Sequence, residues 1–461
     1  MTIRFSKLTF VQIDQAMVKV PSTLCQLKNS LAPINRLPPE VLALVPAFRD
    51  SEKDLINATA VCKYWRRTFV STPDLWTNLS CSERASTDII RPRINAYFAR
   101  SGAVPVNVQM HAHASRLLSP YTGRISRLTL FIDGQSDIDE ISKRLSKPAP
   151  LLETITLRAN HRDRRTLALP PRFFEGFLSS ARTLILRGLV LSPGPCPLSK
   201  LTKFTLNARL ARVTATALLD TLEQMPLLRI FEAHLKFANQ QDPVSRRRVV
   251  TLPYLEEIAI TMHGNWFIPI AGPILPALRL PRARRVVFVA TGACNAPFTP
   301  ILPLSFKDRL PRLSDLSKAS AAFDDDFNVI KFFGPDDSEL KICTRSHVPY
   351  AFTEPIFGGV PFDSVRRLWV SFRGFAVDTV FFVNLLRSMR GLERLKMIQD
   401  AAVPLASLVG ADEQASMCPA LSTLIVDADI NETKRRIKEL KQVREGAGVP
   451  IANVEIRQTL N

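Results

Sequence analysis

The chain has 461 residues, of which 46% are hydrophobic and 22% are charged, which is typical of a globular protein with more than one domain and excludes a disordered chain. The formal net charge of +19 favours acidic partners such as nucleic acid, an anionic membrane or an acidic protein surface. The basic residues are scattered in small groups with no run of five, however, so nucleic acid is the weaker interpretation. The seven cysteines include no C-x-x-C pair, which excludes a typical disulfide framework or zinc site and favours the cytoplasm or the nucleus.

Residues 1–33 form an N-terminal extension without an interpretable motif. Their first part has no uninterrupted apolar core and carries Asp14 and Lys19, so no signal peptide is expected. The longest apolar stretch, Trp266–Leu280, is interrupted by prolines and is too short to span a bilayer as a helix. The sequence therefore predicts no association with a membrane.

Residues 34–80 predict a small module of three short helices. Pro38 and Pro39 suit the first turn of the first helix, where a missing N–H costs nothing, and Pro46 must end or kink that helix. In the second helix the apolar residues recur at spacings of three and four and form one stripe: Leu55, Ala58, Val61, Cys62 and Trp65.

The third short helix begins at Pro73 and carries two large apolar residues, Leu75 and Trp76. A module of about 45 residues is too small to bury this much apolar surface by itself. The leftover helix faces dock either on the rest of the chain or on a partner protein. Periodicity alone leaves both interpretations open, and core packing is the commoner of the two.

Four linked submotifs of this stretch resemble the F-box family: Leu37-Pro38-Pro39-Glu40-Val41-Leu42, Asp54-Leu55, Val61-Cys62-Lys63-Tyr64-Trp65 and Pro73-Asp74-Leu75-Trp76. The resemblance implies a three-helix module that docks on a Skp-family adaptor and, through it, joins a cullin in a ubiquitin ligase. It also implies which residues form the module's core and its adaptor-facing surface, namely Leu37, Pro38, Val41, Leu42, Leu55, Val61, Cys62, Trp65, Leu75 and Trp76. The sequence departs from the family at Pro46, where a bulky apolar residue is usual, and at Arg49, where leucine is common.

Residues 81–118 form a linker or the start of the next domain. Within them Pro92–Ser101 predicts a helix that ends at Gly102. Val104–Met110 alternates in polarity and predicts a strand.

A short sequence segment with alternating apolar positions recurs through residues 119–461 and predicts a half-buried strand at each occurrence. The strand anchors are mostly 20–30 residues apart, or multiples of that: Leu128, Ile155, Leu184, Phe204, Ile258, Leu368, Leu395 and Leu424. Between them lie helical stretches, namely Ile138–Leu145, Arg172–Ser179, Thr214–Met225, Val377–Met389 and Glu432–Glu445. The pattern predicts an α/β fold in which the three-helix module precedes an irregular leucine-rich-repeat solenoid, with a curved, mostly parallel sheet and outer helices.

Between about residues 290 and 364 the period weakens. There, Asn328–Phe333 and Glu339–Cys343 flank Gly334-Pro335-Asp336-Asp337, which predicts a β-hairpin near 328–343. An F-box followed by degenerate leucine-rich repeats resembles large families of such proteins in fungi.

No sequence motif for catalysis is present: the chain has no P-loop, G-x-G-x-x-G, G-x-S-x-G or H-E-x-x-H. His111 and His113 are two apart and share a face if they lie on a strand, but no cysteine or carboxylate cluster accompanies them, so surface histidines are favoured over a metal pair. Asp324-Asp325-Asp326 lacks the alternation and the glycine of a calcium loop and reads as a solvated turn. No catalytic residue, cofactor or metal site is predicted.

The sequence thus predicts a non-catalytic F-box subunit that recruits a target protein to a Skp–cullin–F-box ubiquitin ligase. The target would bind the repeat domain, where arginine pairs such as Arg284-Arg285 and Arg366-Arg367 could form charge-assisted hydrogen bonds with acidic or phosphorylated segments. Two alternatives stay open: a scaffold or nucleic-acid-associated basic protein that works outside a ligase, and an enzyme of unrecognised type.

Overall fold

The computed structural model describes residues 29, 31–47, 52–81, 85–144, 147–160, 167–170, 173, 180–192, 194, 198–237, 248–263, 274–291, 306–323, 327–345, 360, 362–372, 379–399, 417–427 and 430–457. These residues form two compact units, which are described separately. Unit 1 contains residues up to Ile132 together with 139–154 and 176–180, and unit 2 contains 133–138, 155–175 and 181–461. Three predictions lie largely outside the described residues: the N-terminal extension, the helix Arg172–Ser179 and the Asp324–Asp326 turn.

Unit 1 begins with a helical module built from short elements: η1 (Pro33–Arg36), α2 (Pro39–Ala47), α3 (Glu52–Val61), α4 (Lys63–Val70) and η2 (Pro73–Trp76). The helix α2 includes Pro46 in its last turn and ends one residue later. The prediction of one continuous second helix was wrong. Cys62 has extended backbone angles, φ −158° and ψ 173°, and separates α3 from α4 as the N-cap residue of α4.

The rest of unit 1 contains the helix α5 (Thr87–Arg100) and three parallel strands, in the order β1 (Asn78–Cys81), β2 (Val106–His111) and β3 (Ile125–Ile132). The predicted start of α5 at Pro92 was wrong, since the helix begins five residues earlier and Pro92 lies inside it. Proline inside a helix removes one hydrogen bond and strains the preceding turn. The helix persists because Ile90, Ile94 and Tyr97 form a fully buried apolar stripe.

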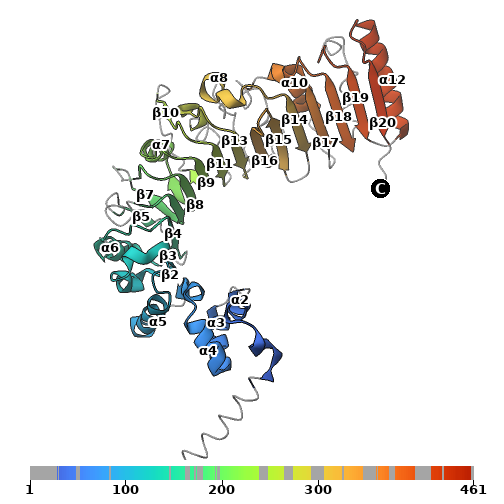
Figure 1. Ribbon diagram of the computed structural model, residues 1–461. Helices are drawn as coiled ribbons and strands as arrows, with labels where there is room; N and C mark the ends of the chain where they lie inside the picture. The colour runs from blue at the N-terminus through green and yellow to red at the C-terminus, as the bar shows by residue number, and fades with distance from the viewer. Residues whose placement is uncertain are drawn as a thin grey trace, which may run out of the picture. The chain divides into compact units, whose positions relative to one another are not determined.

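Unit 2 is dominated by a large, mostly parallel sheet (Figure 1). Its strands follow one another in this spatial order: β4 (Thr154–Ala159), β6 (Thr183–Arg187), β8 (Lys203–Val213), β9 (Ile230–Phe237), β11 (Glu257–Met262), β13 (Arg285–Ala290), β16 (Glu339–Arg345), β15 (Phe327–Phe333), β14 (Lys318–Phe323), β17 (Arg367–Phe372), β18 (Arg394–Gln399), β19 (Thr423–Asp427) and β20 (Asn453–Arg457). Two further sheets have two parallel strands each: β5 (Leu167–Leu169) pairs with β7 (Leu189–Leu191), and β10 (Val250–Thr251) pairs with β12 (Leu278–Arg279). The mixed α/β class and the large sheet agree with the prediction.

The parallel strands are joined by connections of nearly constant length. Paired residues at the start of β8, β9, β11 and β13 are Lys203, Ile230, Glu257 and Arg285, which are 27, 27 and 28 residues apart. The corresponding residues of β17 to β20 are Arg367, Arg394, Thr423 and Asn453, which are 27, 29 and 30 apart. The eight predicted strand anchors all lie in strands and are all buried.

Helices cover the face of the unit 2 sheet on which these anchors lie. α7 (Ala215–Glu223) starts at Thr214, whose Oγ1 accepts a hydrogen bond from Ala217 N at 3.1 Å as an N-cap. α10 (Thr379–Ser388) packs on the sheet through Phe382, whose ring meets the edge of Phe372 of β17 at 5.5 Å between centroids. α12 (Ile430–Gly446) precedes the last strand, while α6 (Gln135–Arg144) has residues in both units. In strands such as β11, β13 and β17, buried side chains on this face alternate with half-buried and exposed side chains on the opposite face.

The regular spacing is interrupted between β13 and β17. β15 and β16 pair antiparallel about the turn Gly334–Asp337, in which Asp336 and Asp337 both have φ of 56°. β14 pairs antiparallel with β15 and parallel with β17. Three strands therefore lie between β13 and β17 in the sheet, in the order β16, β15 and β14, which is the reverse of their order in the chain. Among the described residues, no helix is both long and apolar enough to cross a membrane.

Candidate functional site

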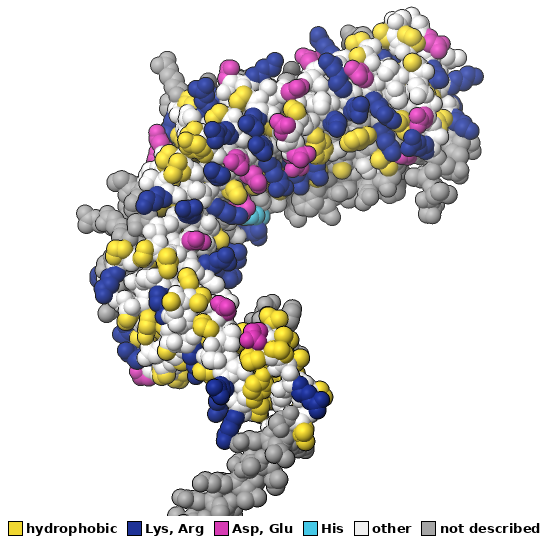
Figure 2. All heavy atoms as spheres, in the orientation of Figure 1, with side chains coloured by type: hydrophobic (Ala, Val, Ile, Leu, Met, Phe, Trp, Pro, Cys, Tyr) yellow, Lys and Arg dark blue, Asp and Glu magenta, His cyan; other side chains and the backbone are white. Residues whose placement is uncertain are grey.

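Exposed apolar side chains concentrate on the helical module of unit 1. Of the thirteen large hydrophobic side chains that are exposed in the described part of the chain, seven lie between residues 31 and 61. They are Leu31, Ile34, Val41, Leu44, Val45, Ile56 and Val61, and this apolar surface is visible over the module in Figure 2. Contiguous exposed apolar surface on a soluble protein marks an interaction site.

The helix α2 explains why so much of this surface cannot be buried. After Glu40, its sequence VLALVPA contains only apolar residues. Leu42 and Ala43 face the interior of the module, whereas Val41, Leu44 and Val45 lie three and four residues apart and form an outward stripe. A helix that is apolar all round is normally covered on all sides, so the outward stripe of α2 lacks its cover.

The residues predicted from the family resemblance fall into three groups. Leu42, Leu55 and Trp76 are buried in the core. Pro38, Val41 and Val61 are exposed, and the half-buried residues are Leu37, Cys62, Trp65 and Leu75. The family pattern therefore joins residues that hold the module together with residues that face outward.

Five exposed apolar residues were not among those predicted: Leu31, Ile34, Leu44, Val45 and Ile56. A signal for three of them was available in the sequence. Once Leu42 is assigned to the core, helical geometry places Leu44 on the opposite side of α2, and Leu44 and Val45, three and four residues after Val41, share the face of Val41. Ile56 follows the same logic on α3, because it comes directly after the buried Leu55.

Trp65 has a positioning role in the structure. Its Nε1 donates a hydrogen bond to Asn35 Oδ1 at 2.5 Å, and its ring meets Phe69 edge to face at 5.3 Å. The neighbouring Tyr64 donates from its hydroxyl to the carbonyl of Leu37 at 2.9 Å. Both side chains of α4 thereby hold the segment around η1, which presents Leu31 and Ile34.

The other side of the module is attached to α5 and β1. Trp76 is 1% exposed and packs edge to face on Tyr97 of α5 at 5.0 Å between centroids. Glu52 of α3 accepts a hydrogen bond from Arg93 Nε at 2.6 Å and another from Ser80 N of β1 at 3.4 Å. The module thus has one face sealed within unit 1 and an apolar face that nothing in the described part of unit 1 covers.

Cys81 of β1 lies beside the Glu52–Arg93 pair and gives a test of this sealed face. Burial raises the pKa of its thiol from 9.0 to about 11, so at pH 8 the reactive thiolate should be about a hundredfold rarer than in the unfolded chain. Because the folded-state pKa is raised, this protection is complete below pH 9 and fades as the pH approaches 11. We expect alkylation by iodoacetamide at pH 8, followed by mass spectrometry, to be about a hundredfold slower in the native protein than in urea. Equal rates would show that Cys81 is accessible, and the half-buried Cys62 serves as the internal reference.

The two histidines considered for metal binding lie on different elements. His111 ends β2, while His113 lies in η3 (Ala112–Leu118), with its Nε2 3.2 Å from the carbonyl oxygen of Ala85. Within the described ranges, no group of three or more His, Cys, Asp or Glu side chains could hold a metal ion.

Comparison with known families agrees with the position of this surface. Residues 34–82 match the family model described as F-box-like. A comparison with curated proteins found no match. The chain therefore contains an F-box-like domain, and six of the seven exposed apolar residues between positions 31 and 61 fall within the matched residues.

Proposed function

We propose that this protein is the substrate-recruiting subunit of a Skp–cullin–F-box ubiquitin ligase. The observation that carries the proposal is the coincidence of the F-box-like match at residues 34–82 with the uncovered apolar surface of α2 and α3. In this proposal Val41, Leu44, Val45, Ile56 and Val61 contact a Skp-family adaptor. Leu42, Leu55 and Trp76 hold the module in shape, and Trp65 positions the segment before α2.

The large sheet of unit 2 supplies the second half of the proposed function. We infer that it is an irregular leucine-rich-repeat domain that holds the target, which is supported by the parallel pairing and by steps of 27–30 residues between β8 and β13 and between β17 and β20. The protein performs no bond chemistry in this role. It brings a target lysine near a ligase-bound ubiquitin in the cytoplasm or nucleus, and proximity alone lowers the entropic part of the barrier.

The adaptor contact is tested by placing a charge on the exposed stripe. We expect Leu44→Asp to weaken binding of a purified Skp-family adaptor at least about thirtyfold, because burying an unpaired carboxylate in an apolar interface costs about 2 kcal/mol or more. Leu227→Asp is the matched control, because Leu227 lies in unit 2 and is 44% exposed, against 51% for Leu44. The measurement is calorimetric titration of the full chain.

Two results would overturn the proposal. The first is a wild-type chain that does not bind the adaptor, and the second is equal binding by the Leu44→Asp and Leu227→Asp variants. Val61→Asp repeats the test from α3, where Val61 is 57% exposed. Thermal unfolding at the wild-type temperature shows that each variant is folded, as expected for changes at exposed positions.

A further inference from the structure

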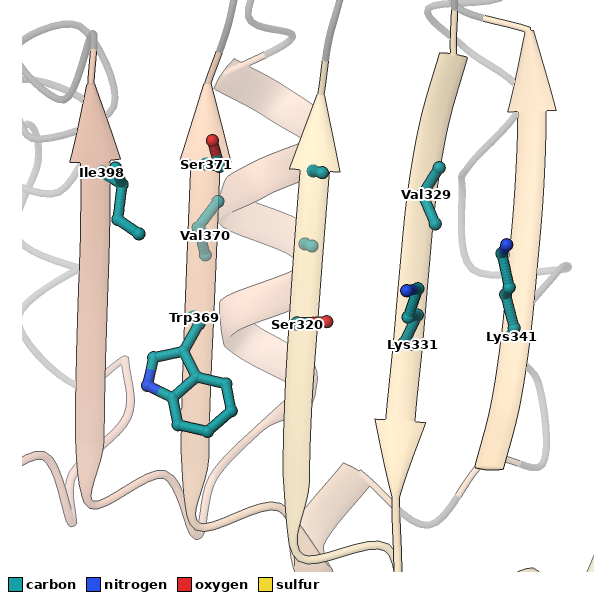
Figure 3. A pocket seen from close by; sticks show the side chains of 10 residues that line it. Ser320, Val329, Lys331, Lys341, Trp369, Val370, Ser371 and Ile398 are labelled. Atoms are coloured by element: carbon teal, nitrogen blue, oxygen red, sulfur yellow. The ribbon is translucent and has the colours of Figure 1, made fainter. Parts of the chain in front are cut away.

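The strands β14 to β18 have a depression of about 410 Å³ on the face of the sheet that is turned away from the helix α10 (Figure 3). Most of the residues that line it come from adjacent strands and lie on one face, where they alternate along each strand with buried residues. In β17, for example, Leu368 and Val370 are buried, whereas Trp369 is 40% exposed. The polar and aromatic lining consists of Ser320, Lys331, Lys341, Trp369 and Ser371.

Two lysines face each other across the antiparallel pair in this depression. Lys331 of β15 is the direct register partner of Lys341 of β16, and both are half-buried. Like charges directly opposite one another destabilise a sheet. No acidic side chain in the described part of the chain pairs with either lysine, so an anion supplied from outside would remove the repulsion.

A second row of cations runs beside the first. Lys318 of β14, Arg367 of β17 and Arg394 of β18 are register neighbours on the same face, and all three are exposed. None of them forms an ion pair with a described residue, whereas the adjacent Arg366 contacts Glu393 at 3.7 Å. Figure 2 shows Lys and Arg side chains gathered over these strands.

Acidic side chains lie on both sides of the cationic patch, which consists of Lys331, Lys341, Lys318, Arg367 and Arg394. Toward β13, Glu339 pairs with Arg285 at 3.2 Å. Toward β20, Asp427 pairs with Lys396 at 2.8 Å and Glu455 pairs with Arg457 at 2.8 Å. A nucleic acid strand would continue over these carboxylates, so a patch of this limited width fits a short acidic protein segment better.

We propose that this face binds an extended acidic peptide segment, with its anionic groups on Lys331 and Lys341 and an apolar side chain on Trp369. The segment would belong to the target, so this inference rests on the proposed function. Neighbouring strands are about 4.8 Å apart, which puts Lys331 and Lys341 two and three strands, or about 10 and 14 Å, from Trp369. An extended peptide rises about 3.3 Å per residue and points successive side chains to opposite sides. Anionic residues two and four positions after the apolar residue therefore share its side, about 7 and 13 Å away, from where their side chains reach Lys331 and Lys341.

The probe is a fluorescein-labelled ten-residue peptide with one leucine and with glutamates two and four residues after it. It is titrated into the full-length chain and followed by anisotropy. A second probe carries phosphoserines in place of the glutamates, a third carries glutamines, and a fourth is single-stranded oligo-dT. We expect at least one of the two anionic peptides to bind and the glutamine peptide to bind at least about tenfold more weakly.

Variants locate the contact. Lys331→Gln with Lys341→Gln should weaken anionic peptide binding at least about tenfold, as should Trp369→Ala. Lys434→Gln with Lys438→Gln is the matched control, because it removes the same charge from two exposed positions of α12, and it should leave binding unchanged. The Leu44→Asp variant, which tests the adaptor contact, should bind the peptide with unchanged affinity, so the two proposals fail separately.

Three outcomes would overturn the inference. Neither anionic peptide binds the wild-type chain, or both double-lysine variants lose binding equally, which would indicate only non-specific attraction by the net charge of +19. The third is oligo-dT binding more tightly than the peptides with dependence on Lys331, Lys341 and Trp369, which would assign the face to nucleic acid.

Discussion

Trp76→Ala is expected to lower the free energy of unfolding of unit 1 by roughly 3–5 kcal/mol, the range for removing a large buried aromatic side chain. The indole is 1% exposed, and its Nε1 donates to the carbonyl of Phe69 at 2.8 Å. The guanidinium carbon of Arg100 lies 4.2 Å from the centre of the ring, on a second side. Alanine would therefore leave a cavity, a Phe69 carbonyl with one hydrogen bond fewer and an Arg100 without its aromatic partner.

Urea unfolding of the full chain, followed by near-ultraviolet circular dichroism and by hydrogen exchange in α4 and α5, measures this loss. Trp76→Phe is the matched control, because it keeps most of the packing and loses the hydrogen bond, and it should cost about 1–2 kcal/mol. Adaptor binding should fall with the folded fraction for Trp76→Ala. An alanine variant as stable as the wild type would show that the module does not depend on its contact with α5.

The contrast between Trp76→Ala and Leu44→Asp shows what the sequence could and could not predict about the module. Family resemblance located the module, because its submotifs occur in order at short spacing. The resemblance could not separate Leu42, which is fully buried, from its neighbour Val41, which is exposed. That separation depends on the direction from which α4 and η2 pack, and hydropathy is nearly the same for the two residues.

The helix break at Cys62 could not be predicted from the spacing of apolar residues, for a related reason. The apolar spacing from Leu55 to Trp65 suits one helix, and none of these residues is a glycine or a proline. The backbone nevertheless leaves the helical region at Cys62 so that α4 can turn back and place Phe69, which is fully buried, in the core. Tertiary packing outweighs the few tenths of a kcal/mol per residue that separate ordinary helix propensities.

In unit 2 the alternating strands and several of the helices could be predicted, because burial on one face imposes a period of two on each strand. The strand β14 was missed, because its sequence KASAAF contains few of the β-branched or aromatic residues that favour strands. As a result, the sequence did not predict that Ser320 would lie between Lys331 and Trp369. The patch on this face joins side chains from five strands, which only the pairing order brings together.

The last prediction concerns Arg444, which joins α12 to the turn before β19. Its side chain is buried, with the whole residue 4% exposed, and it donates to the carbonyls of Met417 at 2.8 Å, Cys418 at 3.1 Å and Val449 at 3.1 Å. Burial lowers the pKa of this guanidinium. The turn that it holds includes Cys418, which has a positive φ of 47° and donates from its thiol to the carbonyl of Leu386 in α10 at 3.2 Å.

Arg444→Met should destabilise the C-terminal end of unit 2 by roughly 3 kcal/mol, because methionine fills much of the space but removes one hydrogen bond from each of the three carbonyls. Hydrogen exchange should show faster opening of α12 and β20, with unchanged protection in α5 of unit 1. Lys434→Met is the matched control, because it replaces an exposed cation on the same helix and should change stability by less than about 0.5 kcal/mol. Equal effects of the two substitutions would mean that the charge of α12, rather than the bridge to Met417 and Cys418, stabilises this end of the sheet.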